Sequence, residues 1–124
     1  MRERRYRSAR QGSLRLAQRR LSGLLPIVGS QLAAEQIRIA NDWWRANRPK
    51  APHAFSEDLT QATALLALQP HLGARARNLV LAGVRRVHLA RIRYDLYYRV
   101  IEEPQPSIGI LALWHSSRRG QPPF

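Results

Sequence analysis

The spacing of the apolar residues changes once along this 124-residue chain, from the period of a helix to the period of a strand. Ala33, Ile37, Ala40 and Trp44 recur at the intervals of one helical face. From Val87 onwards, apolar and polar residues alternate instead. A chain with helical spacing first and strand spacing second is expected to pack a helical layer against a sheet, so the pattern predicts an α+β fold.

The first half predicts one short strand and two helices. The apolar run 24–28 predicts the strand, and Ser30 is a candidate N-cap for the first helix. Pro49 and Pro52 separate that helix from a second one. The apolar face of the second helix is formed by Phe55, Leu59, Ala62 and Leu66. Two helices joined by so short a link predict an antiparallel helical hairpin.

The second half predicts a sheet of short, sequential strands. Alternation continues through 93–100, where Tyr94 and Tyr98 share a face with Leu96 and are therefore predicted to be core residues. The segment 108–114 is apolar on both faces, which is typical of a central strand. We expect an antiparallel meander with the helical hairpin packed on one face.

Charge limits the functions that this chain can perform. The formal net charge is +13 and 20 of the 21 basic residues are arginine, which favours an acidic or polyanionic partner over a neutral metabolite. The chain has no cysteine, and its apolar runs are too short to cross a membrane. Residues 1–23 carry a net +7 without a secretory apolar segment. We interpret 1–23 as an Arg-rich extension, either a solvated tail, a start-site artefact or an arm that orders on nucleic acid, and 24–124 as the folded domain.

Five segments of the chain form a distinctive series, in this order: NDWWRANRP (41–49), LLALQPHLG (65–73), GVRRVHL (83–89), YDLYYRV (94–100) and LALWHSSRR (111–119). Together they resemble RelE/ParE-family toxins, the poison halves of bacterial type II toxin–antitoxin systems. The resemblance implies a β-α-α-β-β-β fold and a cytoplasmic, plasmid-stabilisation type of growth inhibitor. It also implies a cognate antitoxin as partner, and neither a cofactor nor a membrane.

The family divides by target, and the resemblance implies different residues for each. RelE-like members cleave mRNA on the ribosome without a metal, whereas ParE-like members inhibit DNA gyrase. His115 stands where some RNA-cleaving relatives carry a catalytic histidine. Asp95 and Ser116 stand where those relatives carry arginine and tyrosine. These departures favour gyrase binding, and a ribosome-dependent endonuclease with His115 as acid or base is the alternative.

Cations with one interleaved aromatic residue are predicted on the sheet face away from the helices, and others extend past the last strand. The candidate residues for target or phosphate binding are Arg86, Arg93, Tyr97, Arg99, Arg118 and Arg119, with His88 on the same face. Such a surface suits phosphates and a stacked base, an acidic antitoxin segment or an acidic groove on gyrase. A solvated strand face is the alternative interpretation. If the chain cleaves RNA, Arg86, Arg93 and Arg118 are the expected phosphate clamps.

The remaining polar and aromatic residues are given structural roles. Trp43 and Trp44 are predicted to pack in the hinge of the helical hairpin. Glu57 and Asp58 are expected to complement the dipole of the second helix. His53, His71 and His88 have no acidic or histidine partners at ligand spacing, so no metal site is predicted. A plain basic module that binds nucleic acid is the further alternative to a toxin.

Overall fold

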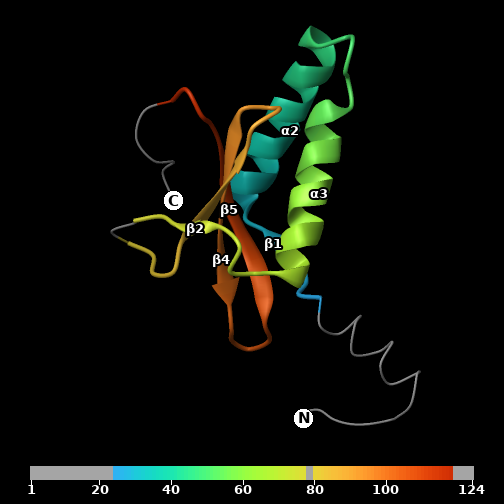
Figure 1. The fold of residues 1–124 in the computed structure, drawn as a ribbon. Coiled ribbons are helices and arrows are strands. Elements are labelled where there is room, and N and C mark those ends of the chain that lie inside the picture. The colour runs from blue at the N-terminus through green and yellow to red at the C-terminus, as the bar shows by residue number, and fades with distance from the viewer. Residues whose placement is uncertain (1–23, 78–79, 119–124) are drawn as a thin grey trace, which may run out of the picture.

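Two helices lie side by side on one face of a five-stranded sheet (Figure 1). The computed structural model describes residues 24–77 and 80–118. In chain order the elements are β1 (Ile27–Gly29), α2 (Gln31–Asn47), α3 (Ala54–Leu68), β2 (Ala74–Arg75), β3 (Arg85–Leu89), β4 (Tyr94–Ile101) and β5 (Ser107–His115). The α+β class and the helical hairpin predicted from the sequence are confirmed.

The sheet is mixed, where a purely antiparallel one was expected. Its strand order is β1-β5-β4-β3-β2. β1 runs parallel to β5, with Ile27 opposite Ile108, and the other pairs are antiparallel. The helical hairpin carries the chain from β1 at one edge of the sheet to β2 at the other edge. The antiparallel run β2-β3-β4-β5 then returns it, so that β5 lies beside β1 in the same direction. The two-residue strand β2 was not predicted, because two residues are too few to show an alternating pattern.

The first helix begins where the sequence placed its cap. Ser30 Oγ accepts a hydrogen bond from the backbone N–H of Ala33 at 3.0 Å, which satisfies one of the free donors in the first turn. The preceding strand was predicted to begin three residues and to end one residue too early, because β1 covers Ile27–Gly29 and not 24–28. Leu25 instead packs against the core, and its N–H donates to the carbonyl of Ala67.

The main core lies between the helices and the sheet. Its fully buried residues include Ala33, Phe55, Leu66, Leu96 and Tyr98. Burial of this face of each helix matches the predicted helical spacing. The core holds both helices against β3, β4 and β5, and thereby fixes where the loops at each end of the sheet lie.

A smaller second core covers part of the opposite sheet face. Val84, Tyr97 and Ala112 are buried in it, and Leu81 and Trp114 pack around them. The sequence predicted an exposed face here. Ala76, Leu81 and Val84, which come from the connection between β2 and β3, contribute to this cover, and such long-range packing leaves no signal in the alternation of β4.

Candidate functional site

A groove opens where the C-terminal half of α2 faces the turn between β3 and β4. We call it the helix groove; its volume is about 670 Å³. It is lined by Ile39, Ala40, Trp43, Trp44, Arg48, Arg91, Ile92, Arg93, Tyr94 and His115. Apolar and aromatic side chains thus form its walls, and cationic groups lie among them.

The two adjacent tryptophans of α2 have different environments. Trp44 is buried, and its Nε1–H donates to the carbonyl of Ala51 at 2.8 Å, as a hinge-packing residue should. Trp43 is 47% exposed, so its predicted hinge role was wrong. The guanidinium carbon of Arg48 lies 5.1 Å from the centre of the Trp43 ring, a cation–π distance. Ile39 lies one helical turn earlier and is 54% exposed. Together, Ile39 and Trp43 give the groove an accessible apolar edge.

The β3–β4 turn brings two arginines to the helix groove. Arg93 has a φ of 64°, a left-handed conformation that residues with a Cβ seldom adopt. This turn places Arg93 on the lining of the groove, whereas the alternation predicted the opposite sheet face. Arg91 donates to Asp58 at 2.6 Å and to Glu57 at 3.2 Å. These carboxylates therefore anchor the turn to α3 as well as lying near the start of that helix.

His115 also lies on the helix side of the sheet. It is opposite Tyr94 in the β4–β5 register, and the centres of the two rings are 5.1 Å apart. The backbone N–H of Ser117 donates to His115 Nδ1 at 3.2 Å, and Ser117 Oγ lies 2.7 Å from the same nitrogen. Nδ1 is thus the acceptor and Nε2 carries the proton in the neutral ring. His115 shares the helix groove with Arg93.

The predicted phosphate clamps are divided between the two faces of the sheet. Arg86 alternates with Val87, whose side chain packs against the main core, so Arg86 is exposed on the face away from the helices. Arg118 extends past the end of β5, where its guanidinium carbon lies 4.5 Å from the centre of the Trp114 ring and its backbone N–H donates to the carbonyl of His115. Arg86 is therefore the clamp that the sheet separates from His115 and Arg93. Arg119 lies outside the described residues.

Two other predicted residues on the outer face are less accessible than expected. Tyr97 points away from the helices as predicted, but it is only 3% exposed within the second core. Its ring is therefore covered and cannot stack on a base, which corrects that expectation. Arg99 is half-buried, and its Nε has no hydrogen-bond acceptor within the described part of the chain.

His88 has a carboxylate partner that the sequence did not reveal. It lies directly opposite Asp95 in the β3–β4 register, and His88 Nδ1 donates to Asp95 Oδ1 at 2.8 Å. Ser116 Oγ is 3.3 Å from the same ring nitrogen. Seven residues separate the pair in sequence, and only the register of the hairpin brings them together. In residues 24–77 and 80–118, no three His, Cys, Asp or Glu side chains gather as metal ligands.

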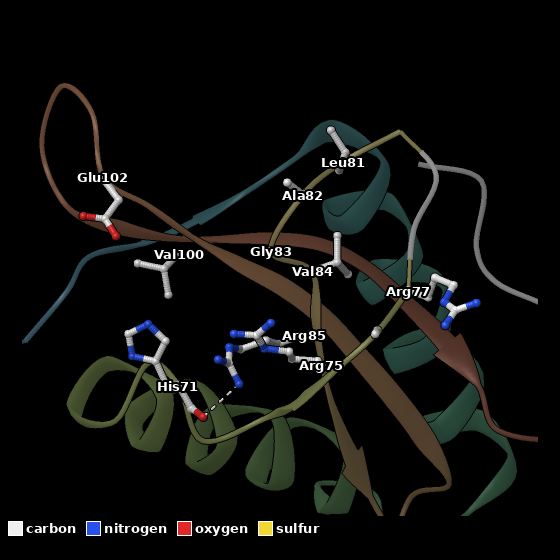
Figure 2. Close-up of a pocket in the computed structure, with 11 residues that line it drawn as sticks. His71, Arg75, Arg77, Leu81, Ala82, Gly83, Val84, Arg85, Val100 and Glu102 are labelled. Carbon is white, nitrogen blue, oxygen red and sulfur yellow. Dashed lines mark hydrogen bonds between the residues drawn. The ribbon is translucent and has the colours of Figure 1, made fainter.

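A second cavity, which we call the strand pocket, opens between the β2–β3 region and the end of β4 (Figure 2). Its volume is about 760 Å³. The lining comprises His71, Arg75, Ala76, Arg77, Leu81, Ala82, Gly83, Val84, Arg85, Val100 and Glu102. Sequence reasoning did not single out this pocket, because its residues come from three separate segments.

Comparison with known proteins identifies the family. The family described as ParE toxin of type II toxin–antitoxin system, parDE, matches residues 27–120. The chain belongs to the ParE toxin family. A solved structure, the chromosomal ParDE toxin–antitoxin system from P. aeruginosa, has 20% sequence identity to this chain and a TM-score of 0.58. The match covers 75% of this chain and 97% of the other, and at this identity it shows a shared fold. No curated protein sequence matches.

Membership of the ParE family confirms the resemblance that five sequence segments predicted. It also implies an antitoxin as a partner of this ParE-family toxin. Neither described helix is long and apolar enough to cross a membrane. Arginine side chains line the helix groove and the strand pocket, and Arg86 is exposed on the outer sheet face.

Proposed function

We propose that this ParE-family toxin arrests growth in the cytoplasm by binding DNA gyrase, and that a cognate antitoxin neutralises it. One observation carries the proposal: the residues expected to form a nuclease centre lie on opposite faces of the sheet. His115 packs beside Tyr94 on the helix side, while Arg86 is exposed on the other. A binding toxin needs no such convergence.

Metal-free RNA cleavage sets strict geometric demands. A base, an acid and at least one cation must surround a single phosphate within hydrogen-bond reach. The helix groove offers His115 and Arg93, but no carboxylate is among its described lining residues. Glu57 and Asp58, on α3, are paired with Arg91 of the turn. This arrangement supports protein binding over the alternative of a ribosome-dependent endonuclease.

The helix groove has the chemistry of a protein-binding surface. Trp43 and Ile39 present half-exposed apolar area, and Arg48 lies over the indole ring. Aromatic and arginine side chains dominate the binding energy of many protein interfaces. We therefore expect the target to contact this groove through an apolar surface with acidic groups at its rim.

Two assays on the purified toxin separate the mechanisms. We expect inhibition of plasmid supercoiling by gyrase, and no codon-positioned cuts in mRNA on translating ribosomes. His115→Ala should retain most of the inhibition, because a binding toxin loses only one rim contact. Cuts that appear with the wild-type toxin and vanish with His115→Ala would establish the endonuclease instead, since acid–base roles contribute about 10²–10⁴-fold.

Trp43→Ala tests the helix groove directly. The side chain is half-exposed, so its removal should leave folding intact while weakening gyrase inhibition at least about tenfold, as loss of an aromatic anchor does. Leu68→Ala is the matched control, because Leu68 is 64% exposed on α3 and does not line the groove. Equal inhibition by both variants would remove the groove from the proposed interface.

A further inference from the structure

The strand pocket exists because β3 is shorter than β4. β3 begins at Arg85, which is opposite Tyr98. The last three residues of β4, 99–101, therefore have no strand neighbour on that side among the described residues. The chain turns away at Gly83, which has a φ of +73° and so adopts a backbone conformation suited to glycine. An open strand edge and a cavity thus lie side by side.

Two arginines face each other beside this edge. Arg75 and Arg85 are direct partners in the antiparallel β2–β3 register. Their β-carbons are therefore about 4.5–5.5 Å apart, a position where like charges are destabilising. Figure 2 shows both side chains next to His71, with Arg77 pointing away from them. In the described residues, no carboxylate forms an ion pair with Arg75 or Arg85.

Arg85 is held in place by the backbone. Its Nη1 donates to the carbonyl of Gly73 at 2.6 Å and to that of His71 at 3.1 Å. Both acceptors are neutral, so these bonds orient the guanidinium without neutralising its charge. Arg75 is exposed and adds a second cation on the same side of the strands. A fixed guanidinium with a second one beside it is suited to bind an oxyanion.

We propose that the strand pocket binds a carboxylate side chain flanked by apolar residues, in an extended segment of the antitoxin. The identity of this partner rests on the proposed function. The carboxylate meets Arg75 and Arg85, and its apolar neighbours contact Leu81 and Val100 on the pocket lining. The open edge of β4 offers backbone groups to an added strand.

The lining also discriminates between anions. Glu102 belongs to the same pocket, so the local field is less positive than the arginines alone would make it. Charge alone does not separate a carboxylate from a phosphate, because both are attracted by the arginines and repelled by Glu102. The apolar part of the lining, however, suits a peptide and contributes little to binding a nucleic-acid backbone.

The probe is an acetylated and amidated tripeptide, leucyl-aspartyl-leucine, titrated into the full-length protein. NMR signals of the arginine Nε–H groups report binding. We expect saturable shifts of the Arg75 and Arg85 signals, and at least about tenfold weaker binding of the tripeptide with asparagine in place of aspartate. Equal binding of both tripeptides would overturn carboxylate recognition. Tighter binding of inorganic phosphate would make this a phosphate site instead.

Arg75→Glu gives the sharpest variant, because it replaces the like-charged pair by an opposite-charged one. The new carboxylate should pair with Arg85, raise the midpoint of thermal unfolding and weaken binding of the tripeptide at least about tenfold. The control is Arg45→Glu, which makes the same change of charge at an exposed position of α2. Binding by Arg75→Glu as tight as by this control would overturn the proposal.

A last experiment uses the antitoxin itself. With the antitoxin as ligand, Arg75→Glu should weaken the complex at least about tenfold, and the free variant should still inhibit supercoiling. An antitoxin that binds both forms equally would overturn the assignment of this partner. If the toxin fails to inhibit gyrase but the tripeptide still binds the wild type, the proposed function fails and the carboxylate site stands.

Discussion

At the scale of single residues, Trp43 and Trp44 make the clearest contrast, because one side chain is exposed and its neighbour is packed. Trp44→Ala should lower the free energy of unfolding by about 3–5 kcal/mol, through the cavity it leaves and the lost hydrogen bond to Ala51. Trp43→Ala should cost about 0.5 kcal/mol or less, as surface changes usually do. Urea denaturation measures both. Similar losses in the two variants would contradict these assigned environments.

Alternation in the sequence predicted the side-chain direction of most strand residues but not their accessibility. It placed Arg86 and His88 on the outer face and Tyr98 in the core, as the structure does. It failed for Arg93, because a residue with positive φ at a turn no longer follows the strand alternation. It also failed for the exposure of Tyr97, because the cover over this ring comes from residues far away in sequence.

At the scale of elements, Tyr98 connects β4 to the loop that follows α3. Its hydroxyl donates to the carbonyl of Pro70 and accepts from the N–H of Gly73, both at 2.8 Å. A Cβ on Gly73 would lie 2.8 Å from the Tyr98 ring, so this close approach requires glycine. Tyr98→Phe leaves both backbone groups without this partner and should cost about 1–3 kcal/mol of unfolding free energy at neutral pH.

The same residue gives the fold a dependence on alkaline pH. Burial raises the pKa of Tyr98 above its ordinary value of 10.0, so folding favours the neutral phenol. Its contribution is present at neutral pH and is lost as the pH rises from about 10 through the raised pKa. Burial also raises the pKa of Tyr94. We therefore expect Tyr98→Phe to lose part, but not all, of the alkaline destabilisation in denaturant titrations. An identical pH dependence in both proteins would contradict this.

The elements differed in how well the sequence predicted them. Both helices and β4 and β5 were predicted, because they are long enough to show their period. The two-residue β2 and the parallel pairing of β1 were not, because one lacks a period and the other depends on the whole topology. The strand pocket was not predicted either. It combines β2, the start of β3 and the end of β4, so no local motif could have located it.

At the scale of the whole molecule, positive charge is divided between the folded domain and the N-terminal segment. Residues 1–23 carry +7 of the total +13, and the remaining +6 belongs to 24–124. The family match begins at residue 27, and the main core uses residues from Leu25 onwards. We propose that 24–124 is the folded domain and that its packing does not depend on the segment before it.

Deletion of residues 1–23 tests this division. The truncated protein should unfold cooperatively at a midpoint close to that of the full chain, because the described core is retained. Exposed charges act at long range and are screened by salt. Supercoiling inhibition by the full chain should therefore weaken more steeply between about 0.05 and 0.2 M salt than inhibition by the truncated form. Loss of the cooperative transition would show that the first 23 residues belong to the fold. Identical salt dependence would show that their charge has no part in binding the target.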